Sequence, residues 1–191
     1  MHLEPFLATY DWQNQPPHGW FKFCPHCGTQ LVVQETNSHP YPTCPACGFI
    51  QFRNPYPTIA IYIVDQGQIL LGQRTGEPGA GLWATPSGYI EYDEDFVSAA
   101  VREAREETGL EVHVQSILHV ESAFLAPQYH FLTVYLLARV VGGALTCTEE
   151  HTTLTWHPLT SPLPPMAFAT DAAVIACLAS GDIQGIPLPT V

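Results

Sequence analysis

A carboxylate-rich segment, residues 88–110, constrains this chain more than any other feature. It runs through a loop into a predicted helix over residues 95–108, which carries Glu103, Glu106 and Glu107. These three side chains stand at i, i+3 and i+4, so they project from neighbouring positions on one helix face. Like charges at this spacing repel each other, and hard oxygen ligands suit magnesium or manganese, which bridge carboxylates to substrate phosphates. The segment therefore predicts a divalent-metal site for phosphate chemistry.

Two further residues of the segment support this interpretation. Arg102 can orient a carboxylate through two parallel hydrogen bonds, and Gly88 allows a close approach of the backbone. The alternative is an amphipathic surface helix held by salt bridges, as most charged helices are. That alternative does not predict the glycines or the fixed spacing.

The hydrophobic pattern predicts an α/β fold with a mixed sheet between helices. The central helix should bury an apolar stripe and end at Gly109, and the last helix should begin near Asp171 and end before Gly181. Strands are expected at 58–64 and 68–73, which form a hairpin around 65–67, and at 82–87, 112–124, 131–140 and 154–157. The predicted stripe consists of Phe96, Val97, Ala100, Val101 and Ala104.

Two Cys-x-x-Cys pairs, each followed by glycine, precede this region. Cys24 and Cys27 form the first pair, and Cys44 and Cys47 form the second. Their spacing suits a tetrahedral four-cysteine zinc site, which has no open coordination position and so should be structural. A pair of redox dithiols or two disulfides is the alternative, but the chain start lacks the features of a secretory signal.

These features divide the chain into three predicted parts. Residues 1–20 form an aromatic leader that should lie against its own domain or a second subunit, and residues 21–52 form the zinc ribbon. The main domain spans 53–191 and begins at a proline-rich linker, where helix and central strand are both disfavoured.

Charge and hydropathy limit the classes of partner. The sequence holds 6 Lys+Arg against 18 Asp+Glu, which gives a formal charge of −12. Such a charge repels a nucleic-acid backbone, so no nucleic-acid partner is expected. No stretch approaches the roughly 20 apolar residues that span a bilayer. We therefore expect a cytoplasmic protein with no membrane partner.

The segment 88–110 resembles the signature of the Nudix hydrolase family, Gly-x5-Glu-x7-Arg-Glu-U-x-Glu-Glu-x-Gly-U, where U is apolar. The flanks Leu70-Leu71-x-x-Arg74 and Gly81-Leu-Trp83-x-x-Pro86 are similar too. The resemblance implies an α/β/α sandwich and hydrolysis of a nucleoside diphosphate linked to a group X; it also suggests a homodimer. The fixed positions are filled by Gly88, Glu94, Arg102, Glu103, Ala104, Glu106, Glu107, Gly109 and Leu110.

The resemblance also assigns candidate site residues. The catalytic candidates are Glu103, Glu106, Glu107 and Arg102. Mg²⁺ or Mn²⁺ would be held by Glu103, Glu107, Glu106 and the carbonyl of Ser87, with Glu149 and Glu150 as further candidates for a general base. The substrate-binding candidates are Arg74, Trp83, Gly88, Phe124, Tyr129 and Phe168.

A ribbon ahead of the signature resembles two branches of the family. NADH pyrophosphatases carry a Ser-Gln-Pro-Trp-Pro-Phe-Pro-x-Ser array, which residues 120–129 lack. The stretch Pro164-Pro165-Met-Ala167-Phe168 is similar to the branch of FAD and ADP-ribose pyrophosphatases, although threonines at 152, 153 and 155 replace an acid that relatives often carry. A hydrolase that removes damaged nucleoside triphosphates and a non-catalytic nucleotide-binding module are the alternatives.

Overall fold

The computed structural model describes residues 21–36, 39–126 and 129–188, so the predicted leader at 1–20 lies outside the described residues. Its contacts define two compact units. One unit holds the described residues up to Tyr56 together with the segment Ser122–Phe131, and the other holds Pro57–Glu121 and the chain from Leu132 onward.

The first unit contains the cysteine module. Its two strands, β1 (Val32–Thr36) and β2 (His39–Thr43), pair antiparallel with Val32 opposite Thr43. Each cysteine pair lies in a tight turn beside this hairpin, and Gly28 and Gly48 close the turns with φ of 72° and 77°. A left-handed backbone is the conformation that glycine adopts most readily.

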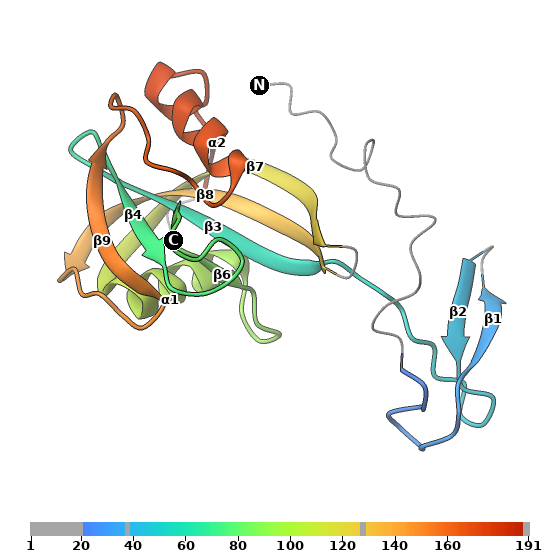
Figure 1. The fold of residues 1–191 in the computed structure, drawn as a ribbon. Coiled ribbons are helices and arrows are strands. Elements are labelled where there is room, and N and C mark those ends of the chain that lie inside the picture. Colours follow the sequence, from blue (N-terminus) through green and yellow to red (C-terminus); the bar gives the residue numbers. More distant parts are fainter. Residues whose placement is uncertain (1–20, 37–38, 127–128, 189–191) are drawn as a thin grey trace. The chain divides into compact units, whose positions relative to one another are not determined.

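The second unit is built on an eight-stranded sheet (Figure 1). The main path of hydrogen-bonded neighbours runs β10-β7-β8-β3-β4-β5, with β6 also paired to β3 and β9 to β4. The strands are β3 (Tyr56–Asp65), β4 (Gln68–Arg74), β5 (Trp83–Ala84), β6 (Ser87–Tyr89), β7 (Leu110–Ala126), β8 (Tyr129–Gly143), β9 (His151–Pro158) and β10 (Ile186–Pro187).

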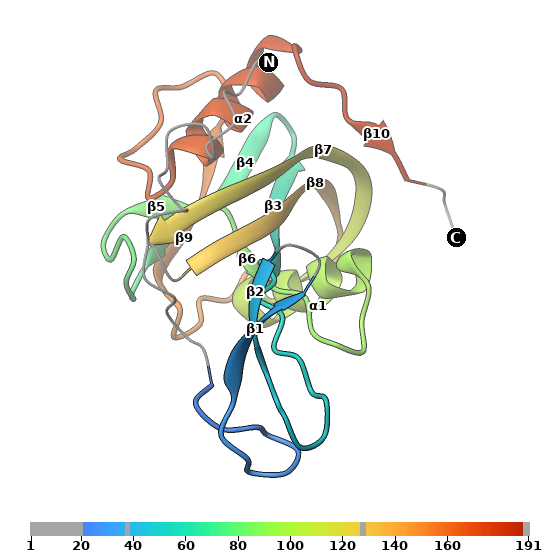
Figure 2. The same cartoon turned by 90° about the vertical axis from the view of Figure 1, so that its right-hand side faces the viewer.

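One helix covers each face of this sheet, α1 (Phe96–Thr108) and α2 (Ala169–Ser180), as Figures 1 and 2 show. Side chains alternate along a strand, so β3 serves both faces. Ile59, Ile61 and Ile63 pack in the cluster that contains the alanines of α1, whereas Ala60 and Tyr62 pack with the apolar residues of α2. The predicted α/β/α sandwich with a mixed sheet is confirmed.

Helix α1 begins and ends where its sequence predicts. The Asp95 carboxylate accepts hydrogen bonds from the backbone N–H groups of Val97 and Ser98, and Gly109 ends the helix in a left-handed conformation. The predicted apolar stripe was wrong at one position, because Val101 is exposed while Ala99 is fully buried. The sheet faces a narrow stripe of small residues, and Ala99, Ala100 and Ala104 allow the helix to approach it closely.

Two strand predictions need correction, and the short strand β10 was not foreseen. The expected strand at 82–87 is two short strands, because the chain leaves β4 after Ala84 and joins β3 at Ser87. Strand β9 begins at His151, three residues before the predicted strand, and its pairing with β4 extends to Arg74 opposite His151. Strand β10 was not predicted, since its two residues gain strand geometry only by pairing with β7.

Neither described helix is long and apolar enough to cross a membrane.

Candidate active site

Glu107, near the end of α1, carries the most perturbed carboxyl group of the candidate site. Only 3% of the residue is exposed, and both carboxylate oxygens lie 3.4 Å from the backbone N–H of Ser87, which donates to them. Burial raises the pKa of Glu107 to about 9, and the neighbouring charges of Glu150 and Glu103 add to this effect. A buried acid with acidic neighbours is a position that a divalent cation would stabilise.

Glu103 lies one helical turn before Glu107 and faces Gly88 of β6. A Cβ atom on Gly88 would collide with the Glu103 carboxyl group, so the bare backbone is what lets strand and carboxylate meet. Burial also raises the pKa of Glu103, although Arg102 opposes that shift. The structure thus places the glycine and the first acid of the predicted metal set in direct contact.

Arg102 joins α1 to the loop that precedes it. Its guanidinium donates to both carboxylate oxygens of Glu94, with Nε 3.0 Å from Oε2, and to the carbonyl oxygen of Tyr89 at 3.0 Å. The remaining nitrogen lies 2.8 Å from Glu103 and 3.0 Å from Glu106. Arg102 therefore holds Glu94 in two-pronged geometry and neutralises part of the acid cluster.

The three acids of the helix face differ sharply in exposure. The Glu106 side chain is 60% exposed and the Glu103 side chain 13%, while the Glu107 side chain is only 4% exposed. Among the described residues, the carboxylate oxygens of these three acids do not all lie as close to one another as the four cysteine sulfur atoms do. Glu103 and Glu107 thus form the inner part of the cluster, and Glu106 stands at its rim.

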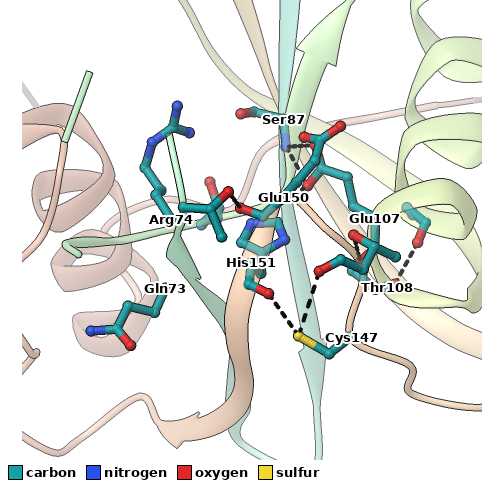
Figure 3. A network of polar contacts seen from close by, with 12 residues as sticks. Gln73, Arg74, Ser87, Glu107, Thr108, Cys147, Glu150 and His151 are labelled. Atoms are coloured by element: carbon teal, nitrogen blue, oxygen red, sulfur yellow. Dashed lines mark hydrogen bonds and ion pairs between the residues drawn. The ribbon is translucent and has the colours of Figure 1, made fainter. Parts of the chain in front are cut away.

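The loop before β9 closes over the end of α1 (Figure 3). Thr75 donates its backbone N–H and its hydroxyl to the Glu150 carbonyl, and the Thr148 hydroxyl donates to the Glu107 carbonyl at 3.3 Å. These bonds hold Glu150 close enough to raise the pKa of Glu107. Of the two acids considered as a general base, Glu150 is thus the one that acts electrostatically on the cluster.

His151 also lies at this site, and the sequence reasoning missed it. Its Nε2 is 3.9 Å from Glu107 Oε2, and both side chains are 4% exposed. Burial lowers the pKa of His151. No sequence signal marked the residue, because it follows two glutamates in a segment that was expected to be a surface loop.

Arg74 and Phe168, two predicted substrate contacts, lie together. The Arg74 guanidinium carbon is 5.3 Å from the centre of the Phe168 ring, and Arg74 Nε donates to the Pro78 carbonyl. Trp83 packs with Met166 on the α2 side of the sheet and exchanges backbone hydrogen bonds with Pro165 and Ala167. The structure therefore brings Arg74 and Phe168 to one place and gives Trp83 a packing role.

Phe124 and Tyr129 belong to the other compact unit. The Phe124 ring stacks on His130 with centroids 4.2 Å apart, and Tyr129 stacks on Phe131 at 6.3 Å. Phe124 lies near the end of β7 and Tyr129 begins β8. A role in substrate binding stays a prediction for both residues.

The four cysteines converge in the ribbon. Their sulfur atoms lie within 4.8 Å of one another, and three pairs are 3.5–3.7 Å apart. An ion with bonds of about 2.3 Å to four sulfurs requires tetrahedral edges of about 3.8 Å. A disulfide would bring two sulfurs to about 2.05 Å, and all four cysteines are free. The donor set and its geometry fit one zinc ion.

Comparison with known proteins identifies the larger unit. The NUDIX domain family matches residues 54–177, more than half of the chain. An ADP-ribose pyrophosphatase of Methanocaldococcus jannaschii is 34% identical over 116 residues, which cover 59% of this chain and 68% of that protein. The NAD-capped RNA hydrolase NudC of Pseudomonas aeruginosa is 28% identical over 146 residues, 76% of this chain and 50% of that protein. The chain thus spans about half the length of that second relative.

A solved structure shares the fold. A NUDIX hydrolase from Nitrosomonas europaea superposes with a TM-score of 0.72 and 22% identity, covering 84% of this chain and 91% of that one. At this identity the similarity describes the arrangement of helices and strands.

Proposed function

Because this chain belongs to the NUDIX family of hydrolases, we propose that it is a metal-dependent pyrophosphatase acting on a nucleoside diphosphate linked to a group X. The candidate substrates are ADP-ribose, FAD or a dinucleotide, and the products would be a nucleoside monophosphate and phospho-X. The similarity to an ADP-ribose pyrophosphatase supports this substrate class.

One observation carries the proposal, the buried carboxylate of Glu107 beside Glu103. Burial and acidic neighbours oppose its ionisation, and a divalent cation would offset both effects. Hard cations with oxygen ligands are also the ions that bridge carboxylates to phosphates. Glu103, Glu107, Glu106 and the Ser87 carbonyl would hold Mg²⁺ or Mn²⁺ there.

The residues of the candidate site would then have distinct roles. Bound Mg²⁺ or Mn²⁺ would polarise the phosphates and lower the pKa of a water molecule. Arg102 positions Glu94 and restrains Glu103 and Glu106. Glu150, held by Thr75, is the candidate to accept the proton of the attacking water, and Arg74 is the cation available to a phosphate oxygen.

The ribbon would bind one structural zinc ion through Cys24, Cys27, Cys44 and Cys47. Its four thiolates leave no coordination position for a substrate, so zinc would stabilise the module and take no part in hydrolysis.

A second candidate substrate is the NAD-type cap of an RNA, because several relatives are named NAD-capped RNA hydrolases. The net charge of −12 opposes binding of a long RNA backbone, so hydrolysis of the cap would depend on contacts to the dinucleotide itself. A hydrolase for nucleoside triphosphates and a binding module without turnover are the remaining alternatives.

The proposal is tested with purified protein, Mg²⁺ or Mn²⁺, and a panel of ADP-ribose, FAD, NADH, NAD-capped RNA and nucleoside triphosphates. Glu107→Gln removes the buried charge, and Glu111→Gln is the matched control at an exposed glutamate just beyond the helix. We expect release of a nucleoside monophosphate by the wild type and the control, but not by Glu107→Gln. Turnover that survives Glu107→Gln would refute the proposed site, and binding without turnover would favour the binding module.

A further inference from the structure

We propose that His151 is a positioning residue for Glu107 and that it strengthens the binding of divalent ions by the acid cluster. The inference rests on the proposed function, because it concerns the same metal-binding carboxylates. It adds a residue that lies outside the family signature at 88–110 and acts through Glu107.

His151 and Glu107 lie close together in a buried site. His151 Nε2 lies 3.9 Å from Glu107 Oε2, and both side chains are almost completely shielded from water. This distance is too long for a hydrogen bond, so the imidazole acts on the carboxylate as a nearby polar group. Because water is largely excluded, the ring dipole acts on the carboxylate more strongly than it would at the surface. The backbone N–H of Ser87 donates to the same carboxylate at 3.4 Å.

The surrounding backbone holds the His151 imidazole in place. A Cβ atom on Gly72 of β4 would collide with Cδ2, Nε2 and Cγ of the His151 ring, so the ring lies directly on the bare backbone of that glycine. The backbone of His151 is held as well, because the Cys147 thiol donates to its carbonyl at 2.9 Å and Arg74 is its partner across the strands (Figure 3). The ring therefore has little freedom to turn away from Glu107.

Packing alone does not account for a histidine at position 151. In the part of the chain that the structure describes, His151 Nδ1 is buried with no hydrogen-bond partner. A buried polar atom without a partner destabilises a fold, so an apolar side chain of similar size would serve packing better. What the histidine supplies and leucine would not is the polar Nε2 edge facing Glu107.

The test compares three substitutions. His151→Leu keeps most of the volume but removes both nitrogens, His151→Gln retains a polar nitrogen near the place of Nε2, and His151→Asn reaches only the place of Nδ1. Affinity for Mn²⁺ is measured by electron paramagnetic resonance on protein already saturated with zinc, together with thermal unfolding. We expect His151→Leu and His151→Asn to weaken Mn²⁺ binding by about 10-fold or more. His151→Gln should recover most of the affinity, and His151→Leu should unfold no earlier than the wild type.

A second route displaces the ring without changing it. Gly72→Ala should also weaken Mn²⁺ binding, because the added methyl group would occupy the position of the His151 ring. Gly76→Ala is the matched control, since a Cβ atom there meets nothing within 4 Å.

The possible results distinguish the positioning role of His151 from the proposed metal site at Glu107. Wild-type Mn²⁺ affinity in His151→Leu, or equal loss in His151→Leu and His151→Gln, would overturn the positioning role alone. Equal Mn²⁺ binding by the wild type and Glu107→Gln would overturn the metal site itself, and the inference with it. Steady-state rates add a further readout, because a positioning role should lower kcat more than it raises KM.

Discussion

Gly88 lies directly against the carboxyl group of Glu103, so closely that a methyl group at position 88 would overlap the Glu103 side chain. The two residues are 15 positions apart in the sequence and come from β6 and α1. The contact fixes how near the strand stands to the acid-bearing face of the helix, which makes position 88 sensitive to any side chain.

Gly88→Ala should therefore reduce activity sharply. The methyl group must push Glu103 aside, and a displacement of about 1 Å at a reacting centre can cost about 100-fold in rate. We expect kcat/KM to fall by about 10- to 100-fold, whereas Gly76→Ala, where a Cβ atom meets nothing, should stay within about twofold of the wild type. Equal activities of the two variants would show that the Gly88 contact does not position the acid.

Arg102→Lys should loosen the loop between β6 and α1. Lysine carries one compact charge and cannot donate to both Glu94 oxygens and to the Tyr89 carbonyl at the same time. Hydrogen exchange of the amides at 89–94 should accelerate and kcat should fall, while the net charge stays constant. Arg105→Lys, in the last turn of the same helix, is the control. Unchanged exchange at 89–94 would contradict the role assigned to Arg102.

Asp171→Asn should change how stability depends on pH. Asp171 is buried, its carboxylate accepts from the Tyr62 hydroxyl at 2.8 Å, and burial raises its pKa from 3.8 to about 6. The folded state thus holds the proton more tightly than the unfolded state does. The stabilisation is complete below the ordinary pKa and is lost as pH rises through about 6, an effect on the order of a few kcal/mol.

Urea unfolding of both proteins at about pH 4.5 and about pH 7 measures this difference. Asparagine does not titrate, so the free energy of unfolding of Asp171→Asn relative to the wild type should improve as pH rises. A relative stability that is the same at both pH values would show that Asp171 does not titrate in this range.

Zinc removal should affect the ribbon before the larger unit. We expect about one zinc ion per chain by elemental analysis, and Cys44→Ser should lower that content because it removes one of four buried or clustered thiolates. Cys177→Ser, in α2, is the matched control and should keep its zinc. Absence of zinc from wild-type protein that was never exposed to a chelator would reject the site.

The sequence by itself determined the local structure around the acids. Asp95 and Gly109 mark the ends of α1 because a side-chain cap and a left-handed glycine act within one turn of the chain. The spacing of Glu103, Glu106 and Glu107 likewise follows from helical periodicity, and the paired cysteines predicted their own convergence. The hairpin of β3 and β4 was visible for the same reason, since its turn lies within three residues.

Only the tertiary structure decided which acid is buried and what surrounds it. Periodicity places three glutamates on one face, but Glu107 became inaccessible while Glu106 stayed exposed because β6 and the loop before β9 approach the helix on one side. His151 reached Glu107 for the same reason: it pairs with Arg74 across β4 and β9, and its ring lies on the backbone of Gly72, which is far away in the sequence. Burial and long-range contacts depend on how segments that are distant in the sequence pack together. A local pattern of residues does not determine that packing.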